Sequence, residues 1–225
     1  MHLSLDIEEL RAYTSAQLNN LFPDKYKIDL DEYKVQVDHA ISRLENCFSM
    51  ITLKHYNNEG KTQLNHLYSD QYLMYVWFLA NTIYQEKENA NLSNKLYCLN
   101  KSLFAFDCMY NTQLPDIFII FHGAGTMLGK AKYSDYFIAL QGCTIGSHKG
   151  NYPILGRGVS LTAHSSIIGN CAIGDRVSVG SYSNVFETNI DADTVIYRNN
   201  EGAIKLNPNS NNYAQQFFNI DLKTI

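Results

Sequence analysis

The sequence lacks the features that would mark a membrane-spanning, secreted or nucleic-acid-binding protein. No apolar run approaches the length needed to cross a bilayer. The first ten residues, MHLSLDIEEL, contain acids and neither a basic start nor a long apolar stretch, so we expect no secretory signal. The net charge of −4 gives no electrostatic reason to expect nucleic acid or an anionic membrane as a partner.

The sequence also lacks a cysteine pattern. The five cysteines are odd in number and form no CxxC pair, so they predict neither a disulfide framework nor a zinc site. A hydrophobic content of 45% with 18% charged residues is ordinary for a globular protein with a core, and 225 residues suffice for one large or two small domains. We therefore expect a protein of the reducing cytoplasm without a metal.

The first hundred residues predict helices. In residues 37–51, apolar side chains recur at three- and four-residue steps. The segment SDQYLMYVWFLANTIYQE opens on a Ser-Asp pair that we expect to cap it, and it is apolar nearly all round, which predicts a buried helix. LSNKLYCLNKSLFAFD is the last candidate helix.

Residues 155–190 follow a different rule. They divide into six units of six residues: LGRGVS, LTAHSS, IIGNCA, IGDRVS, VGSYSN and VFETNI. The first position is aliphatic in every unit, and neither a helical period nor simple alternation produces this. The pattern predicts a parallel β-solenoid with three short strands per eighteen-residue coil and the first positions pointing inward. A looser six-residue phase runs upstream through Ile120, Ile138 and Thr144, and the insertion GSHKGNYP, residues 146–153, then interrupts it; such insertions often form a binding face.

The repeats resemble the left-handed parallel β-helix of hexapeptide acyltransferases, and a helical domain in front of them resembles the serine acetyltransferase family. The family motif DHATGIVVG is similar to FHGAGTMLG here, which places His122 on the catalytic histidine. Asp107, fifteen residues earlier, matches the aspartate that orients this histidine in the family. FIALQGCTIGS is similar to the family's SILQSVTLGG, and VSLTAHSSIIGN is similar to VMIGAGAKILGN.

The resemblance implies an α+β fold in three parts. An α-helical domain is expected at residues 1–110, a left-handed parallel β-helix of hexapeptide repeats at residues 111–206, and a C-terminal tail at residues 207–225. It also implies acetyl-CoA as co-substrate and a homotrimer with sites between subunits. A dimer of trimers through the helical domain is an open alternative.

The chemistry of these residues fits acyl transfer to a hydroxyl. An imidazole titrates near neutrality, so His122 is the natural general base. A carboxylate on its second nitrogen, from Asp107, would fix the tautomer and stabilise the imidazolium. No serine or cysteine nucleophile is needed, and Cys143 is better explained as a small inward-facing residue.

The expected binding residues fall into two sets. The pantetheine arm of the coenzyme would pair with backbone groups near Thr144, Gly146, Ala163 and Ser181. The phosphates of the coenzyme would be attracted by three cations, Lys149, Arg198 and Lys205. On the acceptor side we expect Phe121, Gln141, His148 and Tyr152.

Three departures from the family concern the acceptor. Phe121 replaces the aspartate before the catalytic histidine, Tyr152 stands where the family loop has histidine, and the helical half shows no evident D-P-A motif. A selective site for a free amino acid must pair both its ammonium and its carboxylate. We therefore predict an acetyl-CoA-dependent O-acetyltransferase acting on a hydroxyl of a sugar or polysaccharide precursor, with serine O-acetylation as the alternative.

Two rival functions remain. A zinc enzyme on this fold needs three histidines around one ion, but the spacing of His122, His148 and His164 contains no H-x4-H pair. A non-catalytic partner-binding protein is the second rival, because serine acetyltransferases insert a terminal isoleucine into the next enzyme and this sequence also ends in isoleucine. For the tail we expect instead that Phe217 and Phe218 pack on the solenoid or on a neighbouring subunit.

Overall fold

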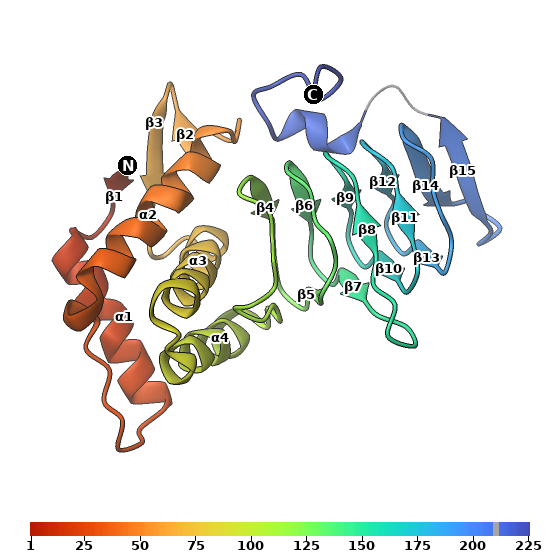
Figure 1. Cartoon of the computed structure of the whole chain (residues 1–225). Coiled ribbons are helices and arrows are strands. Elements are labelled where there is room, and N and C mark those ends of the chain that lie inside the picture. The colour runs from red at the N-terminus through yellow and green to blue at the C-terminus, as the bar shows by residue number, and fades with distance from the viewer. Residues whose placement is uncertain (209–211) are drawn as a thin grey trace. The chain divides into compact units, whose positions relative to one another are not determined.

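The computed structural model describes residues 1–208 and 212–225 of the chain (Figure 1). These residues form two compact units, one made of residues 1–49 and 53–111 and the other of residues 50–52 and 112–225. Three residues of the predicted tail, 209–211, lie outside the described residues.

The first unit is mainly helical. Its elements are a small sheet in the order β1-β3-β2 and five helices, among the described residues: β1 (His2–Leu3), α1 (Ile7–Leu21), η1 (Leu30–Tyr33), α2 (Lys34–Ser49), β2 (Asn57–Asn58), β3 (Lys61–Leu64), α3 (Ser69–Lys87) and α4 (Ala90–Phe104). Helix α1 begins with a capping box, in which the Asp6 side chain accepts from the Glu9 amide and the Glu9 side chain accepts from the Asp6 amide.

Helix α3 is the buried helix that the sequence predicts. It is buried over nearly its whole length and packs against α2 and α4. The expected Ser-Asp cap is wrong, because the N-cap is Tyr68 and Ser69 is already helical. The Tyr72 amide donates to the Tyr68 carbonyl at 3.0 Å, so the first helical turn starts one residue earlier than the cap pattern predicts.

The second unit is a parallel β-helix (Figure 1). Its described residues form three sheets, ordered β4-β6-β9-β12-β14-β15, β5-β7-β10-β13 and β8-β11. Among these residues every strand pairing is parallel except that of β14 with β15. The strands are β4 (Phe118–Ile120), β5 (Met127–Leu128), β6 (Phe137–Ala139), β7 (Thr144–Gly146), β8 (Ile154–Leu155), β9 (Ser160–Leu161), β10 (Ser166–Ile168), β11 (Ala172–Ile173), β12 (Ser178–Val179), β13 (Asn184–Phe186), β14 (Thr194–Arg198) and β15 (Ile204–Pro208).

The hexapeptide register is confirmed over residues 155–185. Ser160 pairs with Ser178, eighteen residues further along the chain, and the other two strands of this coil pair with the same offset. The first positions of the six units are all buried and fill the interior of the coils: Leu155, Leu161, Ile167, Ile173, Val179 and Val185. Stacking of aliphatic side chains along the axis therefore holds this part of the solenoid together.

The looser phase upstream is confirmed at Ile120, which aligns through Ala139 with the inward Leu161, but it is wrong by one residue at Ile138 and Thr144. Ile145, not Thr144, aligns with the inward Ile167. Ile138 aligns with Ser160, whose chain neighbour Leu161 faces the interior, so Ile138 lies on the outer face. The coils before residue 154 differ in length, because the first turns and the 146–153 insertion add or remove residues. A fixed spacing of six residues therefore does not identify the inward-facing positions there.

Candidate active site

His122 lies on an exposed turn directly after β4. Its backbone has φ of 55°, in the left-handed region that few non-glycine residues adopt and where histidine is enriched. The turn is closed by the Thr126 amide, which donates to the Gly123 carbonyl at 3.1 Å, and by the Thr126 hydroxyl, which donates to the Leu140 carbonyl at 2.6 Å. The imidazole is thus presented to solvent by a turn that is fixed to the next coil.

Three predicted site residues lie at the same corner of the solenoid as this turn. The amides of Gly142, His164 and Tyr182 donate to the carbonyls of the preceding coil at 2.9 to 3.1 Å. These hydrogen bonds stack the turn that follows His122 on the turns of the next three coils. The accepting carbonyls belong to Ala124, Gln141 and Ala163, and Ser181 directly precedes Tyr182 in the last turn. The structure therefore brings Gln141, Ala163 and Ser181 to one edge with the His122 turn.

Thr144 and Gly146 occupy β7, the strand that leaves this corner. Thr144 pairs with Met127 on one side and with Ser166 on the other, and Gly146 pairs with Ile168. Cys143, which precedes them, is fully buried, and its thiol donates to the Thr162 carbonyl at 3.1 Å. Burial raises the pKa of the Cys143 thiol, as expected for a packing residue.

The insertion 146–153 folds as a tight hairpin. His148 and Asn151 exchange backbone hydrogen bonds of 3.1 and 2.9 Å, and Lys149 and Gly150 between them both have positive φ, which is the geometry of a two-residue primed turn. Tyr152 is 46% exposed beside this turn. The hairpin therefore presents Lys149 and Tyr152 to solvent.

A carboxylate that the sequence analysis missed anchors this hairpin. Glu187 Oε1 lies 3.1 Å from His148 Nδ1 and also accepts from the Asn170 amide at 3.1 Å. Hydrogen bonds from the Asn170 amide and from His148 hold the pKa of Glu187 below its ordinary value. The sequence signal for this contact was the repeat: Glu187 lies one eighteen-residue coil after Gly169, and so is expected beside Gly169 and Asn170.

The two cations near the end of the solenoid belong to one hairpin. Arg198 ends β14, and Lys205 lies on the antiparallel strand β15. Arg198 donates from Nε to the Tyr182 carbonyl at 3.1 Å and from Nη1 to the Gly202 carbonyl at 2.7 Å. Two of its donors are thus committed to the fold, whereas Lys205 is exposed.

Asp107 lies in the helical unit, beyond the end of α4. It accepts from the Tyr97 hydroxyl at 2.7 Å and from Lys101 Nζ at 2.8 Å. Burial alone would raise the pKa of Asp107, but the hydrogen bonds from Lys101 and Tyr97 outweigh it and keep the carboxylate ionised. His122 belongs to the other unit, so its pairing with Asp107 stays a prediction.

Among the described residues, no group of three His, Cys, Asp or Glu side chains is placed to hold a metal ion. Nor is any helix in residues 1–208 and 212–225 both long and apolar enough to cross a membrane.

The chain is similar to solved structures of serine acetyltransferases. No family model matches the sequence, and no curated protein sequence matches it. The serine acetyltransferase of Neisseria gonorrhoeae superposes with a TM-score of 0.67 at 16% identity, covering 92% of this chain and 82% of that one. The enzyme of Brucella abortus strain S19 gives a TM-score of 0.67 at 15% identity, with coverages of 92% and 85%.

The chain has the serine acetyltransferase fold. The predicted architecture, a helical domain followed by a left-handed parallel β-helix, is therefore confirmed. A further serine acetyltransferase structure of this fold, a complex with CoA, gives a TM-score of 0.64 at 16% identity and covers 86% of this chain and 83% of that one.

Proposed function

We propose that this protein is an acetyl-CoA-dependent O-acetyltransferase with His122 as general base. One observation carries the proposal: in a chain with the serine acetyltransferase fold, the histidine of the matching motif is exposed on a fixed turn at the corner that also holds Gln141 and Ala163. An imidazole in such a position is suited to removing a hydroxyl proton.

The proposed reaction is direct transfer within a ternary complex. His122 removes the proton of the acceptor hydroxyl while the oxygen attacks the thioester carbonyl, and backbone N–H groups of the glycine-rich turns stabilise the oxyanion. The tetrahedral intermediate then collapses, the carbon–sulfur bond breaks, and the imidazolium returns its proton to the leaving thiolate. Asp107 would orient the imidazole, since a carboxylate that accepts from Lys101 and Tyr97 still has lone pairs for a third donor.

The coenzyme is proposed to lie along the corner and β7. Backbone groups at Thr144, Gly146, Ala163 and Ser181 would pair with its pantetheine amides. For its phosphates, Lys149 and Lys205 are the stronger cation candidates, because Arg198 already donates twice to backbone carbonyls. A homotrimer and a cytoplasmic location stay predictions.

For the acceptor, the comparisons favour the serine alternative over the sugar. The Neisseria gonorrhoeae and Vibrio cholerae structures that this chain resembles are serine acetyltransferases, and a further structure of the Neisseria enzyme is a complex with serine. We therefore propose serine as the first acceptor to test. A sugar hydroxyl is the second candidate, supported by two residues: Phe121, which offers no acid to an ammonium group, and the exposed Tyr152, which has a ring that could pack on a sugar face.

The experiment is a thiol-release assay with acetyl-CoA, serine and a panel of mono- and disaccharides. His122→Asn is compared with His164→Asn, since both histidines are exposed at positive φ on the same corner and asparagine tolerates that backbone. We expect turnover in the wild type and in the His164 variant, and a loss of at least about a hundredfold in the His122 variant. No turnover with any acceptor together with no binding of acetyl-CoA would overturn the proposal.

A further inference from the structure

The C-terminal segment covers the outer face of the largest sheet. In β9 and β12, Leu161 and Val179 point inward, so Ser160 and Ser178 point outward, yet both serines are buried. The Tyr213 amide donates to the Ser178 hydroxyl at 3.2 Å. Residues 212–225, here called the tail cover, therefore lie on a sheet face that a bare solenoid would expose to water.

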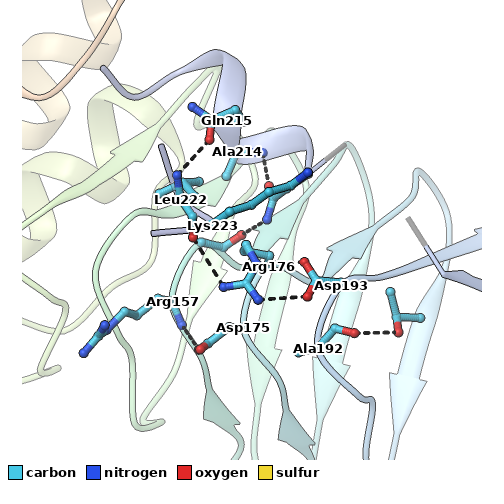
Figure 2. Close-up of polar contacts among 12 residues, drawn as sticks. Arg157, Asp175, Arg176, Ala192, Asp193, Ala214, Gln215, Leu222 and Lys223 are labelled. Carbon is cyan, nitrogen blue, oxygen red and sulfur yellow. Dashed lines mark hydrogen bonds and ion pairs between the residues drawn. The ribbon is translucent and has the colours of Figure 1, made fainter. Parts of the chain in front are cut away.

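The far end of the tail cover is held by polar contacts (Figure 2). Arg176 Nη1 donates to the Leu222 carbonyl at 3.3 Å, while its Nε and Nη2 donate to the two carboxylate oxygens of Asp193. The Leu222 amide donates to Gln215 Oε1 at 2.9 Å. A cavity of about 400 Å³ is lined by Arg176 and by six residues of the tail cover, Gln215 and Leu222 among them, so the docked segment itself forms most of its lining.

At Phe217 and Phe218, the tail cover is held by packing of aromatic side chains. Phe218 is 1% exposed, and its ring lies edge-on to Tyr136 with centroids 5.3 Å apart. The backbone at Phe217 is held by Thr52, whose amide donates to the Phe217 carbonyl at 2.9 Å. The expectation that both phenylalanines pack on the solenoid is confirmed for the solenoid of the same chain.

Phe217 connects this segment to the His122 turn. Its ring is 6% exposed and lies 5.8 Å from the Phe121 ring, measured between centroids. The Phe121 ring in turn lies 4.1 Å from the imidazole of His122. A continuous row of rings therefore runs from the tail cover to the candidate base, and Tyr213, 5.4 Å from Phe217, extends it.

This row gives a physical reason for the phenylalanine before His122. An ionised aspartate at position 121 would lie against the buried ring of Phe217, which would remove part of its hydration. Phe121 instead shares apolar contact with Phe217 and leaves only a half-buried ring beside the imidazole. Residue 121 and the tail cover are thus matched to each other.

We infer that Phe217 is a positioning residue, which acts through Phe121 to fix the His122 turn. Because His122 has a left-handed backbone, its turn has a conformational cost that neighbouring contacts must offset. The contact from Phe217 holds the Phe121 ring, and the Phe121 ring limits the orientations of the imidazole. The consequence for catalysis rests on the proposed function, but the positioning itself does not.

The test compares Phe217→Ala and Phe217→Leu with Phe186→Ala. Phe186 is a matched control, because its ring lies 4.9 Å from another histidine, His148. Histidine ring resonances are recorded by NMR without substrates, and those of His122 and His148 are assigned from the corresponding asparagine variants. We expect Phe217→Ala to move the His122 ring resonances, Phe217→Leu to restore them in part, and Phe186→Ala to move only those of His148.

The kinetic arm then measures kcat and KM for acetyl-CoA. We expect Phe217→Ala to lower kcat about tenfold with little change in KM, since misplacement of a catalytic group affects the chemical step. An unchanged His122 resonance in a folded Phe217 variant would overturn the inference, and a moved resonance with an unchanged kcat would overturn its consequence for catalysis. If the wild type shows no turnover, the proposed function fails while the resonance data still decide the positioning role.

Discussion

His148 Nδ1 lies 3.1 Å from Oε1 of Glu187, a residue that stands on a coil two turns further along the solenoid. This contact fixes the 146–153 hairpin to the body of the β-helix, and the Phe186 ring packs on the same imidazole. The hairpin carries four residues with predicted binding roles, Gly146, His148, Lys149 and Tyr152, and a carboxylate outside it helps to set its orientation.

Replacing that carboxylate is expected to loosen the hairpin without unfolding the solenoid. In Glu187→Ala, the Asn151 amide, which donates to the His148 carbonyl, should exchange with deuterium about tenfold faster. Glu201→Ala, an exposed acid in the β14–β15 hairpin, is the control. Equal exchange at Asn151 in wild type and Glu187→Ala would show that the turn alone holds the hairpin.

Asp107→Asn tests the predicted orientation of His122. An amide would favour the wrong imidazole tautomer, so kcat should fall about a thousandfold while the fold is kept. Asp38→Asn, an exposed carboxylate in α2, serves as the control and should retain activity. An unchanged kcat in Asp107→Asn would leave Asp107 as the partner of Lys101 and Tyr97 only.

Close coil packing predicts a large cost for one glycine substitution. A Cβ at Gly174 would clash with the Ala192 amide nitrogen, and this backbone cannot move without shifting the next coil. We expect Gly174→Ala to lower the free energy of unfolding by about 3 kcal/mol. Gly150→Ala meets nothing within 4 Å and should cost only about 1 kcal/mol, from its φ of +80°. Denaturant titrations that gave equal values would contradict this difference.

The ion pair at the tail cover predicts a small pH dependence. Arg176 hydrogen bonds hold the pKa of Asp193 below its ordinary value of 3.8. Because the folded pKa is depressed, the stabilisation is present above the unfolded pKa and is lost as the pH falls through the folded pKa. Asp193 is 43% exposed, so solvent screening limits the contribution to about 1 kcal/mol or less.

Thermal unfolding of Asp193→Asn checks this expectation. At pH 7 the melting temperature should fall by no more than about 4 °C, and the difference from wild type should shrink in acid. Asp191→Asn, an exposed carboxylate for which the described structure gives no ion pair, should show no such difference. A larger gap in acid than at neutral pH would contradict the assigned sign.

Much of the fold was predictable because it depends on local repetition. Each aliphatic first position from Leu155 to Val185 meets its equivalent one coil away, so a fixed period in the sequence becomes a fixed register in space. The phase failed at Ile138 and Thr144, where coils of unequal length break the period. Counting residues in the sequence does not show where the register shifts, because the added residues form turns that project from the coil.

The sequence by itself determined the helical first unit, the eighteen-residue coils and the motif that contains His122, because spacing and motif encode these locally. Only the tertiary structure decided that Glu187 anchors His148 and that Phe217 packs on Phe121. These pairs join residues far apart in the chain, and their separations in sequence are not multiples of the eighteen-residue coil. The contact of Glu187 with His148 exists because the coils stack. The contact of Phe217 with Phe121 exists because the tail cover docks on an otherwise exposed sheet face, so both contacts form only in the assembled solenoid.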